Sequence, residues 1–377
     1  MKPVFTGKPS PSLIAITGAA LVFYQEIDVA LNPELRIVTP TPEGIAKWRP
    51  LEEIAETARR AIPANSRPGF VYYPADERQS FMFFYQVKNA ETGLSDTKNV
   101  FVDPYTGHVL GSRVFYSSRS VFDYCLIGFL FKLHYSLLLH ETGKTIVGVM
   151  AVLAFVSTVT GIIIWWPKNN RWRGAFTLKW PAKSERLHFD LHRLAGFYLT
   201  PVALCVLLSG VFFNLPNQFR VTVELFSRLT KIEELVSRPE GDAVLTLDAA
   251  LDAAMSRYPQ GRMYALTMPK DDNAPYVIHQ LFPIGWGLQG RRAIYVDKFN
   301  GSLMHVRDPL SGDGDGFIAW QWPLHSGYVL GWPGRIAVFL FGLSWPLMFY
   351  TGVIRWLHKR RAKRIHNERA SVRALVR

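Results

Sequence analysis

The sequence is poor in cysteine and has no nucleotide-binding loop. Only Cys125 and Cys205 occur in 377 residues, and Cys205 falls inside an apolar run that Cys125 would not reach, so we expect no disulfide framework. No Cys-x-x-Cys-His motif is present, which excludes a covalently attached c-type haem. The chain also lacks a Gly-rich phosphate loop and a Rossmann fingerprint. A flavin or nicotinamide would therefore have to arrive on a separate protein.

Charge is nearly absent from three long apolar runs. They cover 143–166, 191–213 and 334–356, and each has 23 or 24 residues, enough to cross a hydrocarbon core about 30 Å thick. A fourth run, 11–24, is shorter and spans a membrane only with help from its flanks. We therefore predict a membrane α-helical fold with four transmembrane helices, at 11–30, 134–166, 191–213 and 325–357.

Basic residues gather beside two of these runs. The segment 167–190 carries a net charge of +4 and the tail from Leu357 carries +7, out of +13 for the whole chain. Such clusters mark cytoplasmic loops under the positive-inside rule, so we read them as topology signals and not as a nucleic-acid patch. The prediction places 167–190 and the tail 358–377 inside, and the polar segments 31–120 and 214–318 outside. The first apolar run lacks a basic start and a small-residue cleavage site, so we expect no cleaved signal peptide.

The two halves of the chain resemble each other. LEEIAETARRAIP, from Leu51, matches LDAALDAAMSRYP, from Leu247, and both are amphipathic helix patterns. FVDPYTGHVLGSR matches YVDKFNGSLMHVR, which aligns Gly107 with Gly301 and predicts two strands joined by a tight turn in each half. The outer segments 31–120 and 214–318 are thus predicted to be two small α+β domains.

Hydroxyl–glycine pairs repeat in the predicted membrane helices. Thr17–Gly18 matches Ser209–Gly210, and Thr160–Gly161 matches Thr351–Gly352. All these matches are offset by 191 to 196 residues, which indicates an internal duplication with few insertions. We interpret the small residues as sites of close helix packing, which small side chains permit in lipid.

Two histidines occupy equivalent places in the repeat. His134 lies nine residues before Gly143, and His325 lies nine residues before Gly334, each ahead of the second helix of its half. Taken alone, either could be an ordinary interfacial polar residue. If the halves pack about a pseudo-twofold axis, however, the two imidazoles face one another on the outer side. A facing pair in an apolar helical setting is what bis-histidine ligation of a b-type haem requires.

On the inner side the candidates are His188, His192 and His358. His188 and His192 are four residues apart on a helix and share a face, so one cannot ligate iron opposite the other. His358 ends the last helix at the same depth. We interpret the remaining histidines as surface, sheet or tail residues without metal-ligand spacing: His108, His140, His279, His305 and His366.

Aromatic residues are dense near His325. They are Phe282, Trp286, Trp320, Trp322, Tyr328 and Trp332. Aromatic residues at this depth are expected as a membrane-interface belt. The alternative is a wide aromatic mouth over the outer haem, which would suit a bulky, partly apolar chelate as substrate.

The order of helix, α+β unit ending VDPYTG, helix, and then LHRLAG resembles the PepSY-associated transmembrane family, also called iron-regulated membrane proteins. Within it, LHYSLLLHETGKTIVGVMAVLAFVSTVTGIIIWWP is similar to ferrioxamine-type siderophore reductases. The resemblance implies a bacterial inner-membrane cytochrome with two b-type haems, which passes electrons to a ferric hydroxamate siderophore in the periplasm. It maps His134 and His325 onto the outer haem and His192 onto the inner one.

One element of the family pattern is missing. Members commonly carry a further LHRxxG element before the first helix, but no histidine precedes His108 here. By position we assign His358 as the second ligand of the inner haem. Two other functions stay open: a non-catalytic periplasmic binding or peptidase-inhibitory protein held by four helices, and a haem-protein partner of another periplasmic reductase. The sequence does not specify the electron donor.

Overall fold

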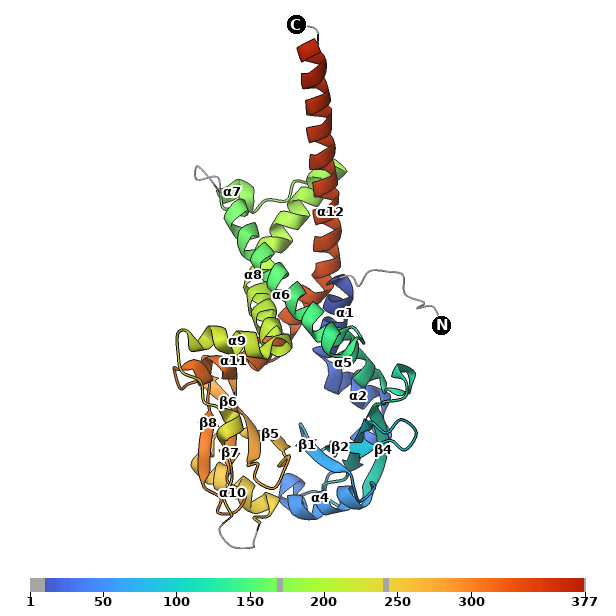
Figure 1. The fold of residues 1–377 in the computed structure, drawn as a ribbon, viewed down its shortest axis with the longest axis vertical. Coiled ribbons are helices and arrows are strands. Elements are labelled where there is room, and N and C mark those ends of the chain that lie inside the picture. Colours follow the sequence, from blue (N-terminus) through green and yellow to red (C-terminus); the bar gives the residue numbers. More distant parts are fainter. Residues whose placement is uncertain (1–10, 168–171, 240–243, 376–377) are drawn as a thin grey trace.

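The computed structural model describes residues 11–167, 172–239 and 244–375, with side chains as far as Arg364 except those of Arg355 and Ala362. Figure 1 shows a stem of long helices above a sheet domain. The helices are α1 (Pro11–Leu21), α2 (Tyr24–Leu31), α3 (Pro33–Arg36), α4 (Leu51–Arg60), α5 (Leu126–Ser136), α6 (His140–Trp165), α7 (Trp172–Ala175), α8 (Ser184–Asn214), α9 (Pro216–Glu224), α10 (Leu247–Arg257), α11 (Gly314–Ser326) and α12 (Trp332–Leu375). The strands are β1 (Arg67–Tyr72), β2 (Phe81–Lys88), β3 (Ser95–Val102), β4 (Val109–Tyr116), β5 (Arg262–Thr267), β6 (Tyr276–Gly285), β7 (Leu288–Val296) and β8 (Leu303–Arg307).

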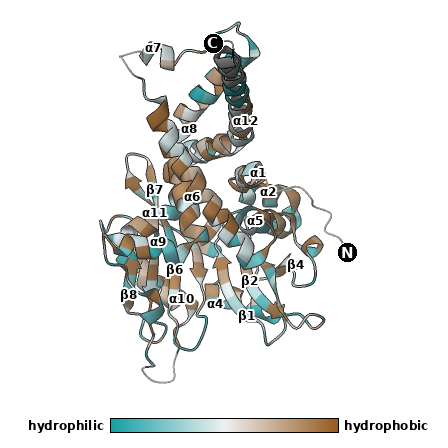
Figure 2. Ribbon diagram, turned by 45° about the horizontal axis from the view of Figure 1, so that its top comes forward, coloured by the Kyte–Doolittle hydropathy of each residue, from teal (hydrophilic) through white to brown (hydrophobic). Residues whose placement is uncertain are grey.

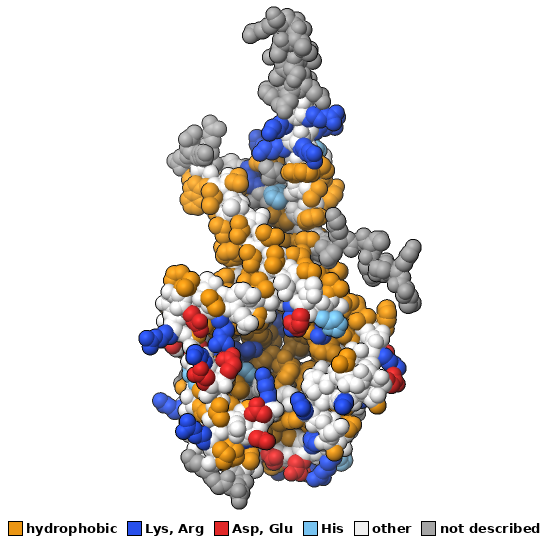
Figure 3. All heavy atoms as spheres, viewed as in Figure 1, with side chains coloured by type: hydrophobic (Ala, Val, Ile, Leu, Met, Phe, Trp, Pro, Cys, Tyr) orange, Lys and Arg blue, Asp and Glu red, His pale blue; other side chains and the backbone are white. Residues whose placement is uncertain are grey.

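The stem has the composition of membrane-spanning helices. Within the described residues, α6, α8 and α12 are each long and apolar enough to cross a membrane, and α1 with α2 makes a fourth candidate bent by 68°. Much of the stem is brown, the colour of hydrophobic residues, in Figure 2. In Figure 3 apolar side chains form an orange band across the face of the stem that is shown. On α6, for example, Leu153 and Ile164 are 65% and 85% exposed, as expected for side chains that face lipid. Above this band, basic side chains of α12 gather on the face of the stem shown in Figure 3. The chain is a multi-pass membrane protein.

Helix boundaries differ from those expected of simple spans. The segment predicted as one helix at 134–166 is divided into α5 and α6, because Leu137 adopts the left-handed conformation with φ of 52°. The segment 325–357 is likewise divided into α11 and α12 at Gly327, where φ is 77°. Helix α8 begins at Ser184, seven residues before the predicted start. The outer histidines therefore lie on short helices next to the spans and not within them.

The two predicted α+β domains share one sheet. It has eight antiparallel strands in the order β4-β3-β2-β1-β5-β6-β7-β8. The first half of the chain supplies β1 to β4 and the second half supplies β5 to β8, joined where β1 pairs with β5 at Val71 and Leu266. The sequence predicted the helix and hairpins of each half but not this central pairing. Each half's turn glycine is confirmed, since Gly107 and Gly301 have φ of 72° and 75°.

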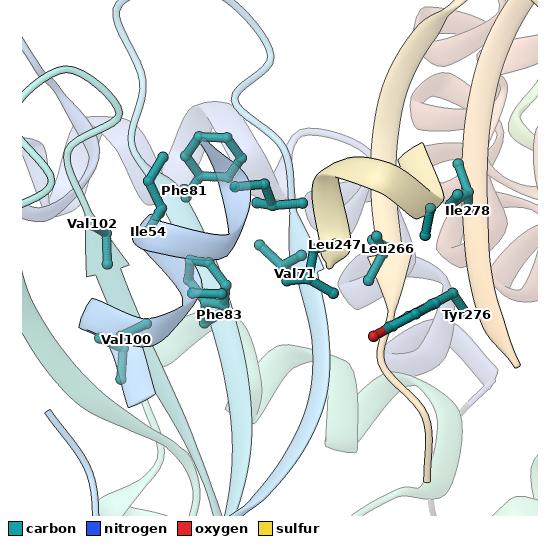
Figure 4. Close-up of a cluster of buried hydrophobic side chains, with 14 of the residues drawn as sticks. Ile54, Val71, Phe81, Phe83, Val100, Val102, Leu247, Leu266, Tyr276 and Ile278 are labelled. Atoms are coloured by element: carbon teal, nitrogen blue, oxygen red, sulfur yellow. The ribbon is translucent and has the colours of Figure 1, made fainter. Parts of the chain in front are cut away.

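Helices α4 and α10 cover one face of the sheet. Ile54 of α4 and Ala250 of α10 are completely buried against strand residues such as Phe83 and Ile278. Figure 4 shows side chains from both halves meeting in this core. The amphipathic patterns from Leu51 and Leu247 are thus confirmed as helices that pack on the sheet.

The same two helices cap each other. Asp248 of α10 accepts hydrogen bonds from the backbone N–H groups of Leu51 and Glu52 at 2.8 and 2.9 Å. In return, Glu52 of α4 accepts one from the backbone N–H of Leu247 at 2.6 Å. Each acidic side chain satisfies the free N–H groups at the start of the other helix. Because Glu52 and Asp248 are equivalent in the repeat, the exchange is reciprocal across the middle of the domain.

The other face of the sheet turns toward the stem. Phe84 and Phe101 pack there with Ile127 of α5, and Tyr264 packs with Trp322 of α11. Helix α5 also contacts α1 and α6, and α11 contacts α8. The two short helices that carry His134 and His325 are therefore held between the sheet and the membrane helices.

Candidate haem-ligand site

The structure brings His134 and His325 together. Their ring centres lie 6.2 Å apart, with an angle of 60° between the ring planes. They come from the equivalent helices α5 and α11, at the point where the stem meets the sheet domain. The facing pair inferred from the repeat is thus present in the fold.

Each ring of this pair is held through the same nitrogen. His134 Nδ1 lies 2.9 Å from the carbonyl oxygen of Ile14, and His325 Nδ1 lies 3.1 Å from that of Val206. A carbonyl only accepts, so Nδ1 carries the proton in both rings. Nε2 is then the nitrogen suited to bind a metal, as in protein sites where the other ring nitrogen donates to a backbone carbonyl.

Each of these rings lies against a hydroxyl–glycine pair of a neighbouring helix, and we call such a pair the seat of the ring. Ser209 Oγ lies 2.9 Å from His325 Nδ1, and Thr17 Oγ1 lies 3.4 Å from His134 Nδ1. A methyl group on Gly18 would stand 2.7 Å from Cε1 of His134, whereas one on Gly210 would stand 3.7 Å from Cε1 of His325. The missing side chain at Gly18 is therefore what lets the His134 ring lie against α1.

His192 has an equivalent seat at the other end of the stem. Its Nδ1 lies 3.0 Å from Oγ1 of Thr351, and a methyl group on Gly352 would stand 3.4 Å from its Cε1. His192 also lines a cavity of about 570 Å³ among α6, α8 and α12, which is within the usual range for small-molecule sites. The wall is mainly apolar and includes Gly161 and Met348.

The other inner candidates lie elsewhere. His358 is half exposed, with Nδ1 3.6 Å from a carboxylate oxygen of Glu185, and it is not among the residues that line the cavity of His192. The ring of His188 packs edge-on against Tyr350 at 5.8 Å. Ligation by His358 stays a prediction. The side chain of His366 lies outside the described residues.

The sheet histidines have local roles. His279 Nε2 lies 3.3 Å from the hydroxyl of Thr267, and burial together with Arg291 and Arg307 lowers the pKa of His279 to about 3. His305 Nε2 lies 3.3 Å from a carboxylate oxygen of Asp315, and burial lowers its pKa. Among the described residues, no group of three or more side chains that could ligate a metal is present.

Only some of the predicted aromatic residues gather. Trp322, three residues before His325, packs on Tyr264 and Tyr328 with ring centres 5.2 and 5.0 Å apart, and the guanidinium of Arg291 lies over its ring at 4.6 Å. Next along the chain, Trp332 stacks on Phe23 of the first candidate span at 5.9 Å.

The remaining aromatic candidates are separate from this group. Trp286 is fully exposed at the turn between β6 and β7, with φ of 52°. Trp320 donates from Nε1 to the carbonyl oxygen of Pro309 at 3.0 Å, and Phe282 is buried beneath Arg292. Of the predicted aromatic residues, Trp322 and Tyr328 thus lie together with Tyr264, whereas the aromatic ring in contact with His325 is that of Phe213, with ring centres 5.2 Å apart.

Sequence reasoning missed the partners of the histidines. Thr17, Ser209 and Thr351 were interpreted as packing residues, yet each has its hydroxyl near a histidine Nδ1. The signal was present in the repeat, because histidines and hydroxyl–glycine pairs recur at matched offsets. A one-dimensional pattern, however, does not show which helix faces which.

The apolar helices of the stem, joined to a mixed helix and sheet domain, and the histidines at both ends of the stem define the class of the protein: a multi-pass membrane protein with candidate cofactor sites. The family described as the PepSY-associated TM region matches residues 12–359, so the chain belongs to this family. No curated protein matches the chain.

Proposed function

We propose that the chain is a cytochrome of a bacterial inner membrane that holds two b-type haems and delivers electrons outward to a ferric hydroxamate siderophore. The proposal includes an internal duplication with four spans, in which α1 with α2 forms the first. The sheet domain would lie in the periplasm and the basic end of α12 in the cytoplasm, as the positive-inside rule favours.

The spacing of His134 and His325 carries the proposal. A metal bound by two imidazole nitrogens at about 2 Å each would hold the ring centres roughly 6 Å apart. The observed separation is 6.2 Å. The protonated Nδ1 atoms are directed to Ile14 and Val206, so the two rings have the tautomer that an axial haem ligand needs.

The inner site rests on His192 and its cavity. The bond between Nδ1 and Thr351 repeats the anchoring seen at the outer pair, and the cavity is mainly apolar, as a b-type haem requires. Bound haem would supply one-electron transfer at both ends of the stem. An electron that moves outward approaches the positive side of the membrane, which favours the transfer by about 2.3 kcal/mol for a potential of 100 mV.

The proposed binding site for the ferric siderophore is the space around Trp322 and Tyr328. These half-buried rings pack on each other, and Trp322 is on the same helix as His325, three residues before it, so they would offer apolar faces to a bulky chelate. One electron reduces one ferric ion to the ferrous state, and the hard oxygen ligands of a hydroxamate hold ferrous iron less firmly, so the metal is released. The electron donor on the cytoplasmic side is unidentified, and any flavin or nicotinamide would have to be held by a separate protein because this sequence has no nucleotide-binding fingerprint.

The decisive experiment is an absorbance spectrum of the purified protein reduced with dithionite. We expect the bands of a b-type haem, and pyridine analysis should give two haems per chain. His134→Ala and His325→Ala should each remove the same haem, and the double variant should lose no more than either single one, because the two ligands act as one unit. A colourless protein made with adequate haem supply would instead favour the binding or inhibitory function.

A further inference from the structure

The first half of the sheet has a cavity on the side that faces the stem. Its volume is about 280 Å³, and it lies between the strands β1 to β4 and the helices α2 and α5, which stand above these strands in Figure 1. Aromatic rings from the sheet and from α5 form much of the wall: Phe70, Tyr72, Phe84, Phe115, Tyr116 and Phe131. No residue to which the proposed function assigns a role lines this cavity.

Three charged side chains also belong to the wall. Asp28 of α2 accepts two hydrogen bonds from the guanidinium of Arg113 on β4, at 2.6 and 3.0 Å. Arg36, the last residue of α3, has its Nε 3.6 Å from Oδ2 of Asp28. Two arginines therefore share one aspartate, and one positive charge of the wall is left unbalanced.

Arg36 is the residue that lacks a full set of partners. It is only 4% exposed, and its Nε has no hydrogen-bond partner among the described residues, since 3.6 Å to Asp28 is too long. Its terminal nitrogens have only the sulfur of Met82 and the amide oxygen of Gln79, each at 3.4 Å. A guanidinium has five N–H groups, and sulfur is a weak acceptor. An anion in the cavity would supply the acceptors and the charge that this buried cation lacks.

We propose that this cavity binds a small monocarboxylic acid with an apolar or aromatic body. A carboxylate carries one negative charge, equal to the unbalanced charge of the wall, and its two oxygens fit the fork of a guanidinium. A phosphate monoester, with a charge of about −1.5 to −2 at neutral pH, would exceed that charge. The aromatic wall covers the body of the acid. This site goes beyond the proposed function and needs no haem.

The position of the cavity gives the ligand both an entrance and a contact with α5. Gln86 is exposed and is one of the lining residues, so the cavity reaches solvent there, beside the hydroxyl of Thr97 at 3.0 Å from its amide nitrogen. Phe131 lines the cavity from α5 and lies three residues before His134. A bound acid would therefore contact the helix that carries His134.

The test is isothermal titration calorimetry of the purified full chain with benzoate, 4-phenylbutyrate and octanoate, each compared with its neutral amide. We expect the acid that fits best to bind at least about tenfold more tightly than its amide, because hydrogen bonds to a charged group are stronger than neutral ones. Arg36→Gln should remove this preference, and Arg36→Lys should retain part of it. Uptake of the ligands by detergent micelles is the same for every variant and cancels in the comparison.

A second pair of variants tests the place of binding. Gln86→Trp should abolish binding of the acid, because the indole would fill the opening. Lys88→Trp, two residues further along β2 and not among the lining residues, is the matched control and should bind normally. Both positions are exposed, so this pair decides the question even if Arg36→Gln does not fold.

Three results would overturn the inference: equal affinity for acids and amides, equal binding in the two tryptophan variants, or no binding of any of the three acids at millimolar concentration. A colourless chain that binds the acid would refute the proposed function and leave this inference in place.

Discussion

Gly18 and Gly210 test whether a missing side chain makes room for an outer histidine. The two glycines occupy equivalent positions in the sequence, but the histidine ring lies closer to Gly18 than to Gly210. A methyl group on Gly18 would stand 2.7 Å from Cε1 of His134, which is about 0.8 Å inside a normal carbon–carbon contact. On Gly210 it would stand 3.7 Å from Cε1 of His325, an ordinary contact. We therefore expect Gly18→Ala to displace its histidine ring and Gly210→Ala to leave the other ring in place.

The size of the effect follows from the cost of overpacking. Forcing an extra methyl group into a filled site costs about 1 to 3 kcal/mol, which corresponds to roughly 5- to 150-fold weaker retention of the proposed outer haem. The ring would move off the carbonyl of Ile14, so the redox potential of any outer haem that remains should also shift. The inner haem should be unaffected in both variants.

The assay is haem content by pyridine analysis together with a redox titration of each purified variant. Loss or a potential shift confined to Gly18→Ala is the expected result. Equal behaviour of the two variants, or a larger effect of Gly210→Ala, would refute the idea that Gly18 makes room for His134.

Three further predictions concern the rest of the chain. A reporter fused to the carboxyl terminus should be active only in the cytoplasm, and one fused near Pro239 only outside it, because the basic clusters lie on the side opposite the sheet domain. Asp248→Ala and Glu52→Ala should each lower the free energy of unfolding by about 1 kcal/mol, since each removes a helix cap. The pKa of His279 in the folded protein, about 3, lies below its ordinary value of 6.5, so the unfolded chain binds more protons between these limits. Stability should therefore fall as the pH drops through this window, by up to about 1.4 kcal/mol per pH unit, and His279→Gln should flatten the dependence in urea unfolding curves.

Each of these has a clear contrary outcome. A reversed reporter pattern would invert the inner and outer assignments. Asp252, an exposed residue on α10, supplies the control for the caps, and an equal loss in Asp252→Ala would argue against a specific role of Asp248. An unchanged pH dependence in His279→Gln would show that another group governs the response to acid.

The sequence predicted the elements of the fold better than their boundaries. Apolar runs and basic clusters report solvent exposure residue by residue, and α6, α8 and α12 follow from them. The divisions at Leu137 and Gly327 depend on left-handed backbone conformations that hydropathy does not record. The pairing of β1 with β5 joins strands almost two hundred residues apart, and such a contact is not encoded by local pattern.

For the candidate site, the repeat supplied the pairing of His134 with His325. Equivalent positions in two halves face each other when the halves are related by an axis, and the rings indeed meet. The positions of the aromatic residues did not follow from the sequence in this way. Their proximity in sequence placed Trp286 and Trp320 beside Trp322, but a strand turn and a helix carry them apart, since side-chain direction depends on the element to which each residue belongs.

The continuous sheet makes the two halves of the chain depend on each other for folding. Because β1 and β5 pair and α4 and α10 cap each other, each half of the chain completes the fold of the other. The outer histidines lie on α5 and α11, and both helices pack on this shared sheet. The sheet, and not the bilayer around the stem, therefore sets the spacing of the two histidines. Two separately produced halves would need to reassemble the sheet before His134 and His325 could face each other, so the proposed haem site would depend on the pairing of β1 with β5.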